Sequence, residues 1–517
     1  MKRIALLLLT LIQLTIRAQG WPADYDGVML QGFYWDSFDE TTWANLQAQA
    51  DDIAPYFSLV WVPQSGWCNT NRGMMGYTPV YYFDQKSSFG SEASLRSMIA
   101  AFRERGTGIV ADVVINHRNV LGNNGSLVDY PAETYNGQTY QMYATDICRN
   151  DDGGATQEWA AAGGLPLSQN KDTGDDWPGC RDLDHKSSNV QACIKAYLKF
   201  LLEDIGYTGF RYDMVKGFHA SYIASYNTTA RPAFSVGEYW DTTQKIRKWV
   251  NRTRDKASGK PTSAAFDFQF RRGMRDAING RDWRKLGGNK RPLAAMNDYR
   301  QYAVTFVENH DTEKRNDFDE QDPIRRDTLA ANAFLLAMPG TPCVFYKHWR
   351  DNGYPLKQMI LARHLAGITN TSASRKLHST KGYFAATTTG KNATLLCIVG
   401  STPQDYNAST AKYVEILSGK GYRYCLDRRA NTVWMDVPDG IYEAPLKVRL
   451  TAISDLADAR IVFTLDGSEP SEGSPQLKSG DTLIIESSCA LRAGILSKGK
   501  VLGIQSRNYK TNNREVK

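Results

Sequence analysis

The chain has 517 residues and a formal charge of +7 at neutral pH, and its basic residues are scattered among acidic ones, as in KRNDFDEQD at 314–322. This mixture lacks the clustered basic face of nucleic-acid-binding proteins, so no nucleic-acid partner is expected. At roughly 100 to 200 residues per domain, the length allows three or four units and a large core.

The first twenty residues, MKRIALLLLTLIQLTIRAQG, have the anatomy of a secretory signal. Lys2 and Arg3 precede an apolar run, and small residues follow near Ala18 and Gly20. We therefore expect residues 1–20 to be a signal peptide that is removed, leaving a charge of about +4, and the protein to be exported to the periplasm, the outer surface or the medium. An uncleaved anchor is the alternative. No later run supplies the ~18 to 20 apolar residues of a membrane-spanning helix, so no transmembrane segment is expected after signal removal.

From about residue 26 to 370, short β-rich runs alternate with helical patterns, which is typical of a parallel sheet wound with helices. The strand candidates are 28–35, 59–63, 108–116, 209–215, 233–240, 264–270, 303–310 and 343–349. Between them, apolar residues recur at helical spacing, as at Leu95, Ile99 and Phe102. The fold class is therefore predicted to be α/β, with a closed (β/α)8 TIM barrel over residues 21–370.

Three further units are predicted around this barrel. Residues 118–181 separate the third strand from its helix, and a structureless loop of that length is improbable, so they are expected to form a protruding subdomain B. After residue 370 the pattern changes to alternating runs with turn residues, which predicts an antiparallel, all-β domain C at 371–436. The turn-rich stretch VPDGIYEAP opens the last unit, a small C-terminal β-sandwich at 437–517.

Polar residues at the carboxyl ends of the strands are the candidates for an active site, because that is where active sites form in such barrels. In chain order they are Asp112, Asn116, His117, Arg211, Asp213, Lys216, Glu238, His310 and Asp311. The stretch GFRYDMVKG at 209–217 sets an acid beside two bases, and Arg211, Asp213 and Lys216 are expected to be buried together. The three carboxylates Asp213, Glu238 and Asp311 are expected to converge.

Two acids that flank a glycosidic bond can hydrolyse it, because one protonates the leaving oxygen while the other attacks the sugar carbon. Asp213 is predicted to be the nucleophile, since Arg211 points to the same strand face and would keep it ionised. Glu238 is predicted to be the acid, with its pKa raised by the charges of Asp213 and Asp311.

Asp311 and the imidazoles of His117 and His310 would then hold sugar hydroxyls and distort the ring toward an oxocarbenium-like state. A lone Asp at a strand end is more often part of a structural ion pair. The catalytic interpretation therefore depends on the agreement of several positions.

Four segments resemble the conserved regions of the α-amylase family of glycoside hydrolases. They are DVVINH (112–117), GFRYDMVKG (209–217), GEYW (237–240) and FVENHD (306–311). The resemblance covers roughly residues 26–435, and QGFYWD (31–36), ICRNDD (147–152) and MPGTPCVFY (338–346) make it most similar to the plant-type branch. It implies a retaining, endo-acting hydrolase of internal α-1,4-glucosidic bonds, with a starch-like or glycogen-like α-glucan as its substrate.

The resemblance also implies roles for individual residues. Asp213 would be the nucleophile, Glu238 the acid/base and Asp311 the transition-state stabiliser. The sugar subsite beside them would contain Arg211, His117, His310 and Tyr77, and Lys216 would bind the sugar on the leaving-group side. Two positions depart from the family pattern: Glu308 stands where Asp is more common, and Lys347 stands where the plant-type branch usually has an acid.

A calcium ion is the expected cofactor, because the inserted segment is rich in oxygen ligands. Asn116, Asp172 and Asp182 are the side chains chosen from the residues alone. The stretch DTGDDWPGCRDLDH at 172–185 is similar to the calcium-binding stretch of plant-type α-amylases, which implies two more ligands, the backbone carbonyls of Asp175 and Gly217. A solvated acidic loop is the alternative.

The sequence is also compatible with other functions. The same barrel could host a transglycosylase or a hydrolase of cyclodextrins and maltooligosaccharides. A non-catalytic glucan-binding protein is disfavoured because all three acids are present. The C-terminal unit resembles small sandwich modules of the fibronectin-associated or chitobiase C-terminal type on bacterial exported glycosidases, and its lack of Trp favours a spacer or surface-docking role. The chain is expected to act as a monomer.

Overall fold

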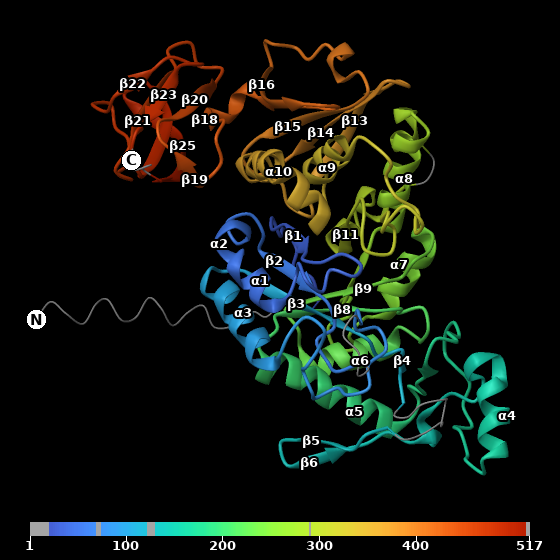
Figure 1. Ribbon diagram of the computed structural model, residues 1–517. Helices are drawn as coiled ribbons and strands as arrows, with labels where there is room; N and C mark the ends of the chain where they lie inside the picture. Colours follow the sequence, from blue (N-terminus) through green and yellow to red (C-terminus); the bar gives the residue numbers. More distant parts are fainter. Residues whose placement is uncertain (1–19, 69–73, 121–129, 289–290, 513–517) are drawn as a thin grey trace, which may run out of the picture.

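The computed structural model describes residues 20–68, 74–120, 130–288 and 291–512 (Figure 1). The expected signal peptide lies outside these ranges except for its last residue, and its removal stays a prediction. None of the helices within the described ranges has the length and apolar character to cross a membrane. All eight cysteines lie in the described part of the chain and all are unpaired there, including the buried thiols of Cys193 and Cys343.

A closed barrel of eight parallel strands forms the centre of the molecule (Figure 1). The strands are β1 (Met29–Gln31), β2 (Leu59–Val62), β3 (Gly108–Val113), β8 (Gly209–Tyr212), β9 (Phe234–Gly237), β10 (Ala264–Phe266), β11 (Ala303–Thr305) and β12 (Thr341–Phe345). Each of them lies within or overlaps one of the eight predicted runs, and almost every residue in them is buried. The predicted TIM barrel is confirmed.

Helices surround the barrel, most of them with one apolar face toward it, whereas α9 is buried on all sides. They are α1 (Trp43–Ala48), α2 (Ala50–Ile53), α3 (Glu92–Glu104), α5 (Ser188–Lys199), α6 (Ser221–Ala230), α7 (Thr243–Arg252), α8 (Phe268–Asn279), α9 (Thr328–Ala337) and α10 (Tyr346–Ala366). In α3 the predicted stripe is buried and Ser91 caps the first turn, because its hydroxyl accepts the N–H of Ser94. A π-helical turn at Phe200–Ile205 extends α5.

All eight predicted runs extend past the carboxyl end of the observed strand, and in two of them the excess residues are helical. The run 264–270 becomes helical after Phe266, because the side chain of Asp267 accepts the Phe270 N–H and caps α8. The run 343–349 belongs to β12 only as far as Phe345, and the remainder is the first turn of α10. In both places apolar side chains continue from a buried strand into a buried helix start, so hydrophobicity alone does not mark the boundary.

The segment after β3 projects from the barrel as a separate subdomain (Figure 1). Its elements are β4 (His117–Arg118), β5 (Glu133–Tyr135), β6 (Gln138–Tyr140), the 3-10 turns η1 (Ala144–Asp146) and η2 (Asp151–Gly154), α4 (Ala155–Ala162) and β7 (Arg181–Asp182). β4 pairs with β7 and so joins the two ends of the insertion. A buried ion pair of 2.8 Å between Arg118 and Glu133 fixes the hairpin of β5 and β6 to that base.

Two antiparallel units follow the barrel. The first is a sheet in the order β13 (Ala373–Ser379), β14 (Tyr383–Thr389), β15 (Thr394–Gly400), β17 (Tyr422–Asp427), β16 (Tyr413–Gly419). Short 3-10 turns accompany the barrel's last third and this sheet: η4 (Trp283–Gly287), η5 (Leu293–Ala295), η6 (Arg300–Tyr302), η7 (Pro403–Asp405) and η8 (Arg428–Ala430).

The C-terminal unit is a sandwich of two sheets with its own core. One sheet has the order β18 (Thr432–Met435), β20 (Leu446–Ile453), β23 (Thr482–Ile485), and the other β19 (Gly440–Glu443), β25 (Lys500–Asn512), β24 (Cys489–Ser497), β21 (Arg460–Thr464), β22 (Gln476–Leu477). β18 pairs with β20, so residues 432–435 join this unit ahead of the expected boundary at 437. Tyr56 and Gln358 of the barrel donate hydrogen bonds to backbone carbonyls of Asp439 and Asp436, which dock the sandwich on the barrel.

Candidate active site

The barrel brings the predicted acids to one edge because all eight strands run in the same direction. Asp213 follows β8 directly and Glu238 follows β9 directly. Asp311 lies on the loop after β11, and its side chain is 28% exposed, whereas Asp213 and Glu238 are buried. The site is thus closed at its floor and open toward Asp311.

Arg211 is the centre of this cluster. Its Nη1 lies 2.7 Å from Asp213 Oδ1 and 2.8 Å from Asp112 Oδ1, and its Nη2 lies 2.8 Å from Glu238 Oε2. The guanidinium is buried and lies 4.9 Å from the centre of the Trp61 ring. Asp112 was collected from the sequence as a strand-end residue without a role, and the structure shows that it shares this cation with the two catalytic candidates.

The pKa of all three buried carboxyls is raised, because the single guanidinium of Arg211 does not offset the effect of their burial. Burial is the largest cause in each case: it raises the pKa of Asp112 to about 6, of Asp213 to about 7 and of Glu238 to about 8, and Arg211 opposes each increase. The expectation that Arg211 alone would keep Asp213 ionised is therefore too simple. The expected increase for Glu238 is present, with burial ahead of the charges of Asp213 and Asp311. Glu238 keeps its proton to the highest pH of the three.

Tyr77 and His310 form the wall beside these acids. The Tyr77 hydroxyl lies 3.1 Å from Asp112 Oδ2 and 2.7 Å from His310 Nε2. The amide nitrogen of Gln31 donates to His310 Nδ1 at 2.9 Å, which assigns the proton to Nε2, the nitrogen 3.2 Å from Asp311 Oδ2. Burial lowers the pKa of His310 to about 4, so the ring is a neutral donor at physiological pH.

His117 supports this wall from behind. It is fully buried, its Nε2 lies 2.8 Å from the backbone carbonyl of Tyr77, and its ring lies 4.1 Å from that of Trp177. Burial lowers its pKa to about 4. Trp35 was not singled out from the sequence, although it lies in the QGFYWD segment. Its ring stacks at 6.1 Å on Tyr77 with an interplanar angle of 9°, which completes an aromatic surface at the mouth.

Lys216 is not buried with Arg211 and Asp213, which corrects the expectation for GFRYDMVKG. Its side chain is 32% exposed, and its amine pairs with Asp175 at 3.1 Å and with Asp241 at 3.5 Å. β8 ends at Tyr212, and Met214 adopts a left-handed backbone with φ of 40°, so the chain turns away from the barrel floor before Lys216.

The predicted metal ligands gather where the inserted subdomain meets the loop after β8. Asn116 Nδ2 donates to Asp182 Oδ1 at 3.0 Å, while Asn116 Oδ1 is buried with no hydrogen-bond partner, as is Asp172 Oδ2. The backbone N–H of Asp175 donates to the carbonyl of Lys216 at 2.9 Å, next to Gly217. A Cβ at Gly217 would lie 1.9 Å from Asn116 Oδ1, so only glycine allows this approach.

Carboxylates of this region could hold a cation. Oxygens of Asp151, Asp176 and Asp182 lie within 4.8 Å of one another, and the first two residues were not predicted. Burial raises the pKa of Asp182 to about 9, and the charges of Asp172 and Asp151 add to the increase. An all-oxygen set with unpartnered buried oxygens and mutually repelling acids fits a hard divalent cation.

All three of these carboxylates already accept backbone N–H groups, that of Asp182 from Trp177 at 2.8 Å. Asp151 Oδ1 accepts the N–H of Asp182 at 2.7 Å, and Asp176 Oδ2 accepts that of Gly153 at 2.8 Å. The oxygens with no partner belong to Asn116 and Asp172. The unpartnered oxygens are therefore on two of the predicted ligands.

A parallel barrel with carboxylates grouped at its carboxyl edge defines the class of TIM-barrel enzymes. The model of the family described as Alpha amylase, catalytic domain matches residues 53–348, a range that contains Asp213, Glu238 and Asp311. Probable alpha-amylase 2 of Arabidopsis thaliana is 30% identical over 382 residues, which are 69% of this chain and 85% of that protein.

A glucan 1,4-alpha-maltotetraohydrolase of Roseateles saccharophilus is 30% identical over 407 residues, which are 73% of this chain and 68% of that protein. In fold the chain is similar to the gamma-CGTase of an alkalophilic Bacillus clarkii, with a TM-score of 0.58 and 15% identity over 95% of this chain and 84% of that one. The chain belongs to the α-amylase family and is a glycoside hydrolase.

Proposed function

We propose that this enzyme is an endo-acting, retaining hydrolase of internal α-1,4-glucosidic bonds in starch-like or glycogen-like glucans. The observation that carries the proposal is that Asp213 and Glu238 bind adjacent nitrogens of the single buried guanidinium of Arg211. This favours the closer carboxyl spacing, about 5 to 5.5 Å, that retaining glycosidases use. Relatives named as α-amylases support the choice of glucan.

In the first half of the reaction, Glu238 gives its proton to the glycosidic oxygen while a carboxylate oxygen of Asp213 attacks the anomeric carbon. Oδ1 of Asp213 is held by Arg211, and Oδ2 receives no hydrogen bond from the described residues, so Oδ2 is the attacking atom. Glu238 Oε2 accepts from Arg211 and from the Met214 N–H, which leaves Oε1 to carry the proton. The bond to the leaving sugar breaks as the glycosyl ester forms.

In the second half, the ionised Glu238 takes a proton from water, and the oxygen of that water attacks the anomeric carbon. The ester bond to Asp213 breaks, its electron pair returns to the carboxylate, and Glu238 is protonated again. Two inversions leave the product in the α configuration. The Nε2–H of His310 and the carboxylate of Asp311 are the groups that hold hydroxyls of the sugar during both steps, and the rings of Tyr77 and Trp35 pack against its faces.

The test is the time course of cleavage of soluble amylose and of a maltoheptaoside blocked at its non-reducing end, followed by NMR at the anomeric protons. Endo action on the proposed bonds predicts cleavage of the blocked substrate and first products in the α configuration. Release of β-anomers would reject the retaining mechanism. Activity on unblocked but not blocked substrate would reject endo action.

A second candidate is the release of one short product from chain ends or the transfer of glycosyl units to another sugar. This candidate is supported by the 30% identity to the relative named a glucan 1,4-alpha-maltotetraohydrolase. The same assay separates the two, because an exo-acting enzyme yields one product length from the start, and a transferase yields products longer than its substrate.

We also propose that calcium is the cation held by Asn116, Asp172 and Asp182 with the neighbouring carbonyls of Asp175 and Gly217. When bound, the ion would neutralise the repelling acids and tie the inserted subdomain to the loop after β8. Chelation by EDTA should lower the melting temperature, and calcium should restore it. A melting temperature that EDTA leaves unchanged, with no metal found by elemental analysis, would reject the site.

We further propose that the protein is exported. Fractionation of cells and N-terminal sequencing of the protein would test this.

A further inference from the structure

We propose that a cavity between the barrel and the sheet of β13–β17 binds a small organic anion with an apolar body, such as an aromatic or short aliphatic carboxylate. The cavity has a volume of about 310 Å³. Helices α8 and α9, the turns η4 and η5, and strands β13 and β14 supply its walls. None of its lining residues belongs to the candidate active site.

The walls are aromatic and aliphatic. Phe270 of α8 stacks on Phe334 of α9 with ring centres 5.5 Å apart, and Phe334 meets Phe384 of β14 edge to face at 5.6 Å. Leu286 and Met338 line the same space. A cavity of this size and composition is at the small end of ligand sites, which are about 300 to 1,000 Å³ and mostly apolar. The body of the occupant is therefore apolar.

The polar groups at this cavity are almost all cationic. Arg291, Arg300, Arg375 and Lys376 line it, and no described Asp or Glu does. Nor does any of these four form an ion pair with a described carboxylate, whereas cations elsewhere, such as Arg271, do so. Positive charge gathered beside apolar walls without a counter-charge is the complement of an anion.

Arg300 is a buried cation without a counter-charge among the described residues, and its burial is unfavourable. A bound anion would offset the free energy that this burial costs. Its side chain is buried, and its Nε has no hydrogen-bond partner. Its other nitrogens bind the Ser372 carbonyl at 2.8 Å and the side-chain oxygen of Asn297, both neutral acceptors. Burial lowers the pKa of Arg300, and the charge of Arg291 lowers it further.

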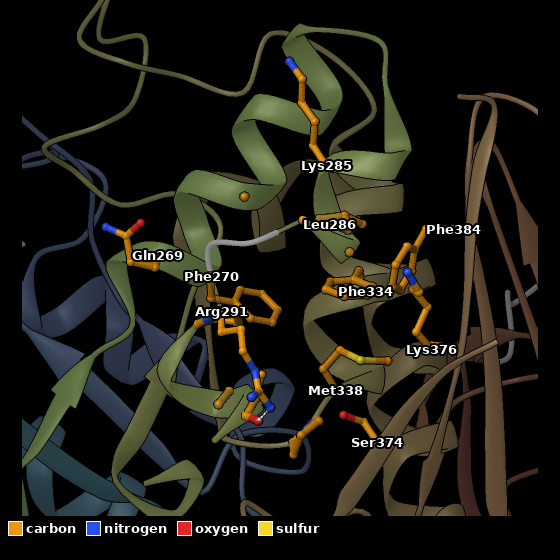
Figure 2. A pocket seen from close by; sticks show the side chains of 18 of the residues that line it. Gln269, Phe270, Lys285, Leu286, Arg291, Phe334, Met338, Ser374, Lys376 and Phe384 are labelled. Atoms are coloured by element: carbon orange, nitrogen blue, oxygen red, sulfur yellow. Dashed lines mark hydrogen bonds between the residues drawn. The ribbon is translucent and has the colours of Figure 1, made fainter. Parts of the chain in front are cut away.

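Two of the cations lie on opposite sides of the space. Figure 2 shows Lys376 beside Phe384 and Phe334, and Arg291 across from them next to Phe270. A Cβ at Gly287 would lie 3.1 Å from Lys376 Nζ and 3.3 Å from the Phe384 ring, so the amine and the ring both lie close to Gly287. Lys285 also lines the cavity, but its amine points away in Figure 2 and donates to the Asp276 carbonyl.

These groups exclude two other kinds of occupant. A neutral sugar needs acceptors as well as donors for its hydroxyls, but the described side chains that line the cavity offer acceptor oxygens only at Gln269 and Ser374, and the charged ones are all donors. An inorganic anion would meet the cations but leave the aromatic walls unused. An anionic head on an apolar body satisfies both parts.

The test is isothermal titration calorimetry of the full-length protein with 2-naphthoate at low ionic strength, with three comparison ligands: neutral 2-naphthylmethanol, glucose 1-phosphate and maltotriose. We expect naphthoate to bind at one site and to bind more weakly as salt is added. The variant Lys376→Glu should weaken binding by about tenfold or more. Lys420→Glu makes the same charge change at an exposed turn outside the cavity and should leave the affinity unchanged.

Four results would overturn the proposal. If naphthoate and naphthylmethanol bind equally, the cations are not used. If glucose 1-phosphate binds as tightly as naphthoate, the apolar body is not recognised. If no heat develops up to the solubility limit of naphthoate, or if the two lysine variants behave alike, the cavity is not an anion site.

Discussion

Replacing Arg211 by Met tests the central electrostatic argument, because the change removes the charge and keeps an unbranched apolar side chain. Arg211 is buried and binds Asp112, Asp213 and Glu238 at 2.7 to 2.8 Å. It lowers the pKa of each of these carboxyls against the effect of burial. Without it, each pKa should rise further.

The loss of Arg211 should also lower the free energy of unfolding. A rise of about one pKa unit is worth about 1.4 kcal/mol, so three carboxyls would lose about 4 kcal/mol once the wild-type groups are ionised. Breaking a buried ion pair by removing one partner costs about 3 to 5 kcal/mol, which agrees. Folded carboxyls with raised pKa values hold protons that the unfolded chain has released, so stability falls as pH increases through this range. The variant's free energy of unfolding should therefore fall little at pH 5, relative to the wild type, and most at pH 8 to 9.

Urea unfolding at pH 5 and pH 8.5 measures this difference, and the pH profile of kcat/KM measures its effect on Asp213. Because Asp213 must be ionised to act as the proposed nucleophile, a higher pKa of its carboxyl moves the acidic limb of the profile to higher pH. The matched control is Arg105→Met, which removes an arginine paired with Asp51 at the surface. This variant should lower the free energy of unfolding little at either pH. Equal destabilisation at both pH values with an unmoved acidic limb would refute the argument.

Two further predictions concern the acids themselves. Asp213→Asn should lower kcat by about a thousandfold or more while maltoheptaose still binds, as judged by calorimetry, and substantial remaining turnover would reject Asp213 as the nucleophile. Asp311→Asn should move the alkaline limb of the residual kcat/KM profile to lower pH, since the charge of Asp311 helps to raise the pKa of Glu238 to about 8; an alkaline limb at its wild-type position would contradict this coupling.

The strands of the barrel were predictable because each is a short run of buried apolar residues between helical patterns. β3 and β8 are buried along almost their whole length, and such runs differ from their surroundings in the sequence itself. The strand ends were less predictable. Asp267 ends β10 by capping α8, and a capping Asp looks the same in the sequence as a polar loop residue.

The candidate acids were predictable from their position at strand ends, but their sharing of one cation was not. Arg211 and Asp112 are 99 positions apart and meet only because β3 and β8 are adjacent in register. Lys216 is three residues beyond Asp213, and the sequence gives no sign that the turn at Met214 carries it outward. Side-chain partners that depend on the path of a loop are set by tertiary structure, which local patterns do not contain.

The loop after β8 connects the proposed active site to the proposed calcium site, because it carries Asp213 at its start and Gly217 four residues later. Asn116, which packs against Gly217, is followed directly by His117, which bonds the backbone of Tyr77 in the active site. A Cβ at position 217 would lie 1.9 Å from Asn116 Oδ1. Because the backbone of Gly217 does not have a positive φ, Gly217→Ala disturbs the contact with Asn116 without straining the backbone.

We therefore expect Gly217→Ala to displace Asn116, to weaken calcium binding and to reduce kcat together. Calcium titration followed by melting temperature measures the first effect, and initial rates at saturating calcium measure the second. Gly353→Ala is the control, because a Cβ there meets nothing within 4 Å. If Gly217→Ala weakens calcium binding but leaves kcat at saturating calcium unchanged, the metal region stabilises the fold without shaping the active site. If calcium binding is unchanged as well, Asn116 is not a ligand, and the acids Asp151 and Asp176 become the better choice for the cation.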